Sequence, residues 1–126
     1  MAETHPLFPS GPWEGFYTYH MGPDAHRHHM HFTLSFDAGI VTGGGGDDVG
    51  GFSWRGHYDK AALTCDMVKH YATHTVLYQG QVDENGIWGV WRIGDNFSGG
   101  FHIWPKAGEE EAVEEAVTEQ VGTRNN

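Results

Sequence analysis

The chain has 126 residues, which is the size of a single domain with one substantial hydrophobic core. Aromatic residues make up 13% of it and glycine occurs 19 times, a composition that favours short strands and tight turns over a helical bundle. The formal net charge is −10 with only seven Lys and Arg, which argues against a basic surface for nucleic acid or for an anionic membrane.

The chain begins with MAETHPLFPSG, which has neither the basic start nor the apolar run of a secretion signal. The single cysteine, Cys65, excludes an internal disulfide, and no run of apolar residues is long enough for a transmembrane helix. Together these features lead us to expect a cytoplasmic protein.

From residue 13 onward, polar and apolar residues alternate in eight segments separated by turn residues. The predicted strands are Trp13–His20, His28–Asp37, Gly39–Gly43, Gly51–Asp59, Leu63–Tyr71, His74–Val82, Gly86–Ile93 and Phe97–Pro105. Most connections have hairpin length, so consecutive strands should be antiparallel neighbours. The sequence therefore predicts an all-β fold, an eight-stranded antiparallel up-and-down β-barrel, as one domain over residues 11–105.

Strand parity assigns one set of side chains to the inside of this barrel, because alternate residues point to opposite faces. The inward set is Trp13, Gly15, Tyr17, Tyr19, Met30, Phe32, Leu34, Phe36, Phe52, Trp54, Gly56, Tyr58, Leu63, Cys65, Met67, Lys69, Tyr71, Val76, Tyr78, Gly80, Val82, Ile87, Gly89, Trp91, Ile93, Gly99, Phe101 and Ile103. Burial of one Trp or Tyr removes roughly 150 to 250 Å² from water. Most of the inward aromatic side chains should therefore form the core.

The segment GFSWRGHYD resembles the fourth strand of the avidin and streptavidin family, a calycin-type barrel, and VLYQGQV and IWGVWRI resemble its sixth and seventh strands. On that alignment Tyr78 and Trp91 stand at the two positions of biotin-facing tryptophans. Gly15 stands where the family has an asparagine, and Phe101 or His102 where it has an aspartate. The resemblance thus implies an avidin-like barrel and a homo-oligomer, but not biotin as the ligand.

An up-and-down topology places every second connection at the same end of the barrel. One end receives only short turns that can close a floor. The other end receives Met21–His26 and the longest connection, Gly43–Gly50, which carries Asp47 and Asp48 and whose glycines predict a flexible lid. We expect this second end to be the mouth.

Polar residues of inward parity gather at the predicted mouth, above aromatic residues of the interior. This mixture is typical of a small-molecule pocket and would suit an anionic or carbonyl-bearing ligand. The predicted ligand-binding residues are Tyr17, Tyr19, His28, Trp54, Lys69, Tyr71, His74, Tyr78 and Trp91. The most informative is Lys69, because a lysine inside an apolar core needs an acidic or hydroxyl partner. The alternative is that Lys69 only bends out of the rim to pair with Asp95 or Asp47.

Two histidine sets offer weaker alternatives for a metal site. On the outer face, His20, His29 and His31 could approach one zinc ion. At the mouth, His26, His28 and His74 could do so with Asp47 or Asp48. Neither set is supported by a cysteine pair or an HExxH motif, so we expect no metal and no other cofactor.

Catalysis would need an activated nucleophile, and the sequence offers little for that role. Cys65 has inward parity in the middle of a strand, which usually means a small, inert hydrophobic residue. We therefore expect a binding module that takes one small molecule, and not an enzyme. The alternatives are a structural or interaction barrel with a filled core, and a histidine-dependent metal-binding barrel.

Three apolar residues, Trp88, Val90 and Trp104, have outward parity on the last two strands. Such a patch is more often an interface than bare surface, so a homo-oligomer is expected through this face. The alternative is that the acidic C-terminal tail, residues 106–126, covers it. The tail carries six Glu beside a narrow row of Val113, Val117 and Val121, which fits a marginal helix as well as an unstructured segment.

Overall fold

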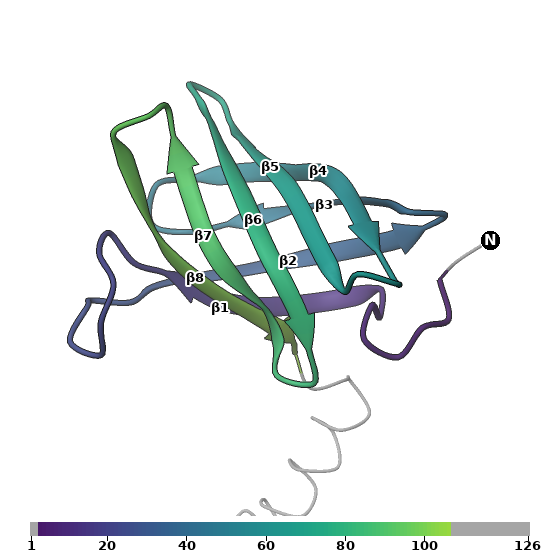
Figure 1. The fold of residues 1–126 in the computed structure, drawn as a ribbon. Helices are drawn as coiled ribbons and strands as arrows, with labels where there is room; N and C mark the ends of the chain where they lie inside the picture. The colour runs from purple at the N-terminus through teal and green to yellow at the C-terminus, as the bar shows by residue number, and fades with distance from the viewer. Residues whose placement is uncertain (1–2, 107–126) are drawn as a thin grey trace, which may run out of the picture.

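The computed structural model describes residues 3–106, which form a closed barrel of eight antiparallel strands in sequence order (Figure 1). The strands are β1 (Gly11–Tyr17), β2 (His28–Asp37), β3 (Ile40–Gly46), β4 (Gly51–Asp59), β5 (Thr64–Tyr71), β6 (Thr75–Asp83), β7 (Gly86–Ile93) and β8 (Phe97–Pro105). The predicted all-β up-and-down barrel is confirmed. Within residues 3–106, no helix has the length and apolarity to span a bilayer. The possible helix of the acidic tail lies outside the described residues.

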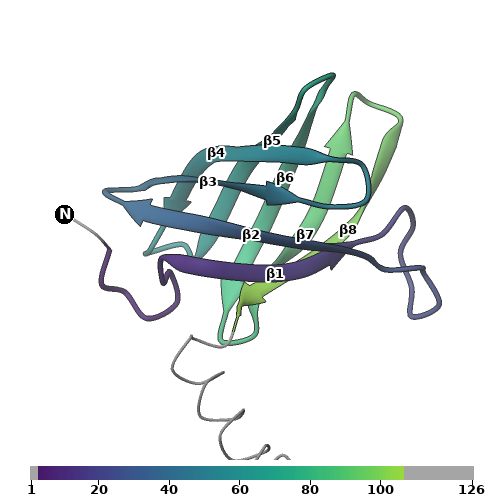
Figure 2. The same cartoon turned by 180° about the vertical axis from the view of Figure 1, so that it is seen from behind.

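Pairing of the first and last strands closes the barrel. Tyr17 of β1 lies opposite His28 of β2 on one side and opposite Phe101 of β8 on the other. Strands β5 to β8 form the wall in front in Figure 1, and they cross the wall of β1 to β4, which lies in front in Figure 2. Every strand therefore has two neighbours, which leaves no open sheet edge.

Two predicted strands end three residues away from the observed C-terminal ends, while the other limits differ by at most two residues. Strand β1 ends at Tyr17 and not at His20, because the register with β2 ends at His28 and the chain then leaves for the connection over residues 18–27. Strand β3 continues through the glycines to Gly46, and both β2 and β4 pair with them. A β carbon at Gly43 or Gly45 would collide with a backbone carbonyl of β2. These glycines permit close approach of the strands, and do not form the flexible lid that the sequence predicts.

The predicted inner face is the core of the barrel. Strand β2 shows the alternation clearly, with every second side chain buried from Met30 to Phe36. The largest side chains that are almost fully buried are Trp13, Trp54, Tyr78, Phe8, Phe36, Lys69, Met30, Leu34, Met67, Ile87, Ile103 and Val41. Most of the interior is thus filled by side chains, as expected for a barrel of eight strands.

The floor of the barrel is covered by residues 3–10, a segment that the sequence pattern did not place. Phe8 is fully buried, and its ring lies 5.5 Å from that of Phe36 and 4.8 Å from that of Tyr58. The Tyr58 hydroxyl donates a hydrogen bond of 2.6 Å to Glu3, and the Glu3 backbone N–H donates to the Phe36 carbonyl. The N-terminal segment therefore closes the end of the barrel opposite to the mouth.

Candidate functional site

The β3–β4 connection at the mouth is a tight turn over residues 47–50. The Asp47 backbone N–H donates to the Gly50 carbonyl at 3.1 Å, and the Asp47 side chain accepts from the Val49 N–H at 2.9 Å and the Gly50 N–H at 3.3 Å. The connection is therefore a hydrogen-bonded turn over residues 47–50, and not the longer lid over Gly43–Gly50 that the sequence predicts. Because its backbone is held by these bonds, the turn can fix the direction of both Asp47 and Asp48.

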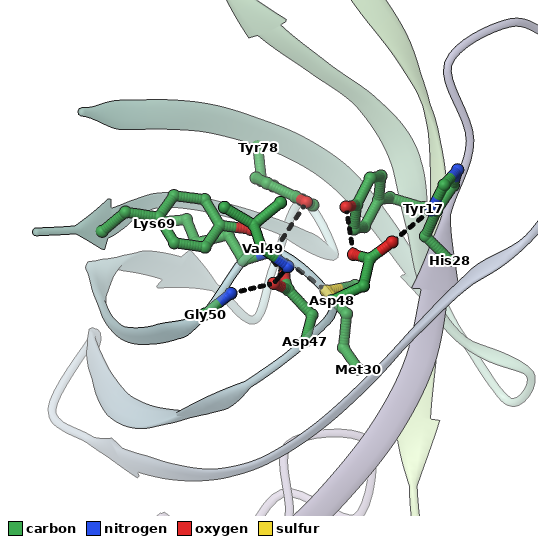
Figure 3. A network of polar contacts seen from close by, with 10 residues as sticks. Tyr17, His28, Met30, Asp47, Asp48, Val49, Gly50, Lys69 and Tyr78 are labelled. Carbon is green, nitrogen blue, oxygen red and sulfur yellow. Dashed lines mark hydrogen bonds and ion pairs between the residues drawn. The ribbon is translucent and has the colours of Figure 1, made fainter. Parts of the chain in front are cut away.

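Asp47 points into the barrel and pairs with Lys69 (Figure 3). The Lys69 Nζ lies 2.5 Å from Asp47 Oδ2, and the two side chains are 1% and 0% exposed. The Tyr71 hydroxyl donates to the same carboxylate oxygen at 2.5 Å. Lys69 also donates to the Tyr78 hydroxyl at 3.3 Å and contacts the Met30 sulfur at 3.2 Å. The ammonium therefore has a partner for each of its three protons.

Five aromatic rings surround the Lys69 ammonium. The ring centroid of Phe52 lies 4.4 Å from Nζ and that of Trp54 lies 5.6 Å from it, distances at which a cation is attracted to a ring. The other three rings belong to Tyr17, Tyr71 and Tyr78.

Burial lowers the pKa of Lys69 to about 8, although Asp47 opposes this shift. Lys69 thus stays inside the barrel, and Asp47 reaches it there. Of the two partners named in the alternative, Asp95 and Asp47, Asp47 is the one observed, but Lys69 does not bend out of the rim to meet it.

Asp48 makes a second network on the other side of the turn (Figure 3). One carboxylate oxygen accepts from the Tyr17 hydroxyl at 2.6 Å, and the other lies 2.6 Å from His28 Nδ1. The Tyr17 and His28 rings are stacked with their centroids 4.9 Å apart. Burial would raise the pKa of Asp48, but the hydrogen bonds from Tyr17 and His28 hold it below its usual value. Asp48 therefore anchors the turn to β1 and β2 as an ionised group.

A pocket of about 220 Å³ opens beside these networks at the mouth. Six of the nine predicted ligand-binding residues line it: Tyr17, Tyr19, Tyr71, His74, Tyr78 and Trp91. Four further lining residues were not predicted for the site: Val49, Val76, Ile93 and Phe97. Of these, Val76 and Ile93 belong to the predicted inward set. Phe97 is two residues before the inward Gly99 on the same strand, so the same alternation also predicts that it points inwards.

The remaining three predicted residues lie around the pocket and not on its surface. Lys69 and Trp54 are packed deeper in the barrel, and His28 lies at the rim with Asp48. The Trp54 indole N–H is buried and has no hydrogen-bond partner among the described residues. Its ring meets that of Tyr78 at 90° with the centroids 4.9 Å apart, so Trp54 supports one wall residue from behind.

One wall of the pocket is aromatic and consists of Trp91 of β7, Phe97 of β8 and Tyr19. Tyr19 and Phe97 are stacked at 6.0 Å, and Trp91 meets both of them edge-on at 5.8 Å and 5.3 Å. The Trp91 indole N–H donates to the Thr18 carbonyl at 2.8 Å, which sets the orientation of its ring. A flat apolar ligand would therefore meet a preformed surface.

The histidines of the two alternative metal sites do not gather. His29 of β2 lies opposite Phe16 of β1, whereas His20 comes after the end of β1 at Tyr17 and is not paired with β2. His28 is engaged with Asp48, and His74 stacks on Tyr71 at 4.8 Å. Among residues 3–106, no group of three or more His, Cys, Asp or Glu is arranged to hold a metal ion.

Cys65 is buried in the middle of β5. Burial raises the pKa of its thiol to about 12, so the thiolate is not populated at neutral pH. This environment is that of a small packing residue.

The outer face of β7, β8 and β1 carries the aromatic residues predicted as an interface. Trp88 is 40% exposed, while Val90 and Trp104 are partly covered. Phe16 extends the patch, with its ring 6.0 Å from that of Trp104. Next to this face lies a groove of about 260 Å³, whose walls include Met21, Phe16 and Trp88. We refer to Phe16, Trp88, Val90 and Trp104 as the outer aromatic face.

No protein-family model, curated protein or solved structure matches this chain. The resemblance to the avidin family therefore stays a prediction from the strand patterns.

Proposed function

We propose that this barrel binds one small organic molecule in the pocket at its mouth. The observation that carries the proposal is the aromatic pocket of about 220 Å³ in a barrel whose interior is mostly filled by the side chains of the described residues. A filled barrel with no cavity would have favoured a purely structural role. Here the side chains leave a space at the end where the tyrosine hydroxyls and both turn aspartates meet.

The size of the pocket favours a ligand with one ring. An apolar protein cavity of about 150 Å³ binds benzene, so the mouth accepts a ring with one or two substituents. The charge of Lys69 is already neutralised by Asp47 at 2.5 Å, and the Asp48 carboxylate lies nearby. A neutral molecule is therefore favoured over an anion, which narrows the ligand class expected from the sequence.

A titration with one-ring fragments, followed by backbone amide NMR shifts, tests this proposal. Saturable shifts should map to the mouth, at Val76, Ile93 and Phe97. Val76→Phe fills the pocket and should abolish binding, whereas Leu77→Phe makes the same kind of change on the neighbouring outward-facing position and should leave binding intact. Equal binding by both variants, or shifts confined to the outer groove, would contradict the proposal.

A second candidate function is assembly through the outer aromatic face. The specific observation is that Trp88 remains 40% exposed, on a face that also carries the ring pair of Phe16 and Trp104. A partner that covered this face would remove apolar surface from water. A second copy of the chain is the partner expected from the avidin-like strand patterns. The two candidates are compatible, because the mouth and the outer face are different surfaces.

A further inference from the structure

The Tyr78 hydroxyl accepts a hydrogen bond but donates none to the described residues. The residue is 2% exposed and lines the pocket at the mouth. Its oxygen accepts a hydrogen bond from Lys69 Nζ at 3.3 Å, as Figure 3 shows. Among the described residues, no acceptor takes the Tyr78 proton, whereas the hydroxyls of Tyr17 and Tyr71 donate to Asp48 and Asp47. A buried hydroxyl usually has a partner for its proton.

We infer that the ligand of the pocket is a neutral aromatic carbonyl compound whose oxygen accepts a hydrogen bond from Tyr78. This inference rests on the proposed function and specifies the chemistry of the same site. The structure offers three reasons: a hydroxyl proton that has no acceptor on a residue that lines the pocket, the Lys69 charge next to this hydroxyl, and the aromatic residues beside it.

Lys69 makes Tyr78 a better donor. A hydroxyl that accepts a hydrogen bond from an ammonium is polarised, and its own proton then binds an acceptor more strongly. Burial raises the pKa of Tyr78, so the hydroxyl keeps its proton over the physiological range. A carbonyl oxygen carries partial negative charge without the desolvation cost of a carboxylate, which suits a site where the lysine charge is already paired.

The rest of the ligand would contact the wall beside the donor, where Trp91 is the cross-strand neighbour of Tyr78. Trp91, Tyr19 and Phe97 form a fixed aromatic surface, and Val76 contributes an aliphatic contact. A planar ring attached to the carbonyl would pack there with offset or edge-on contacts. An aliphatic chain would fill the same volume with poorer contact to the rings.

The experiment uses acetophenone and ethylbenzene as probes, because they have nearly the same shape and only acetophenone has a carbonyl oxygen. Affinities are measured by titration for the wild type, Tyr78→Phe and Tyr58→Phe. Tyr78→Phe should lower the ratio of acetophenone to ethylbenzene affinity about 3- to 10-fold, the value of one neutral hydrogen bond. Tyr58→Phe is the matched control, since it removes the hydroxyl of a buried tyrosine at the floor, away from the pocket, and the ratio should not change.

Infrared spectroscopy of acetophenone bound to the wild type keeps the inference testable if a variant does not fold. The carbonyl stretch should lie at a lower frequency than in an apolar solvent, as hydrogen bonding requires. If neither probe binds, both the proposed function and this inference are wrong. If both probes bind but the affinity ratio is the same in the wild type and Tyr78→Phe, or the carbonyl stretch is that of a free carbonyl, only this inference is overturned.

Discussion

The ammonium of Lys69 lies 2.5 Å from a carboxylate oxygen of Asp47, and both side chains are shielded from water. Lys69 is in β5 and Asp47 follows β3, so the pair ties the β3–β4 turn to β5, the strand next to β4. The turn thereby covers part of the barrel end, and the pocket is what remains open. The shape of the mouth thus depends on this ion pair together with the contacts of Asp48 to Tyr17 and His28.

The first prediction concerns the stability of that pair. Lys69→Met leaves the Asp47 carboxylate buried without a cation, and we expect unfolding to become easier by about 3 to 5 kcal/mol. The double variant Lys69→Met with Asp47→Asn keeps an acceptor for the Val49 and Gly50 N–H groups and removes both charges. Its stability should lie within about 1 kcal/mol of the wild type. Urea unfolding of the four proteins of this cycle checks the prediction, and additive effects of the two single changes would contradict it.

The second prediction follows from the pKa of Lys69, which is lowered from 10.5 to about 8 in the folded protein. Between these values the unfolded chain binds more protons at this position than the folded one, so the free energy of unfolding rises as the pH increases from 8 toward 10. The double variant without the pair should lack this rise. Above pH 10 the raised pKa values of Tyr17, Tyr71 and Tyr78 act in the opposite direction. Denaturant titrations at several pH values measure the slope, and a wild-type curve parallel to that of the double variant would contradict the assignment.

The third prediction concerns acid stability at the floor. Hydrogen bonds from the Tyr58 hydroxyl and the His5 backbone N–H lower the pKa of Glu3 from 4.5 to about 2. Its stabilising effect is therefore complete above pH 4.5 and disappears as the pH falls to about 2. Glu3→Gln should be less stable than the wild type at pH 7, with a difference that shrinks over that range. Glu14→Gln removes the same charge from the outside of β1 and serves as the control in acid-unfolding curves.

The fourth prediction separates stability from binding. Phe8 is fully buried against Phe36 and Tyr58 at the floor, so Phe8→Ala should cost about 3 to 5 kcal/mol of stability. Because the pocket is at the other end of the barrel, fragment affinity at a temperature where the variant is folded should not change. A parallel loss of affinity in titrations would show that the floor and the mouth are coupled.

The fifth prediction tests the outer aromatic face. Trp88→Glu places a charge in the middle of this surface and should shift an oligomer toward monomer in sedimentation velocity. Ile40→Glu, at an exposed position on β3 in the other wall of the barrel, is the control and should leave the assembly unchanged. A wild type that is monomeric at high protein concentration would exclude assembly through Trp88.

The fold follows from features that a sequence displays openly. Alternation in HHMHFTLSFD places Met30 to Phe36 inside, and hairpin-length connections leave neighbouring antiparallel strands as the simplest arrangement. The same parity finds Tyr17, Tyr71 and Tyr78, because side chains at strand ends of one parity face the mouth. These parts of the fold and the site depend on local periodicity.

The position of Asp47 could not be predicted in this way. A glycine run gives the same pattern whether it is a mobile loop or a strand such as Gly43–Gly46 that lies close to its neighbour. The difference depends on contacts with β2 and β4, which are distant in sequence. Phe8 escaped notice for a similar reason, since its segment has no alternation and its burial depends on a cavity made by other strands.

A crystal structure of the protein soaked with acetophenone tests the central claim most directly. We predict one molecule in the mouth pocket, with its ring against Trp91 and Phe97 and its oxygen about 3 Å from the Tyr78 hydroxyl. An empty pocket at a saturating probe concentration, or a probe bound only in the groove beside Trp88, would contradict the assignment of the mouth as the binding site.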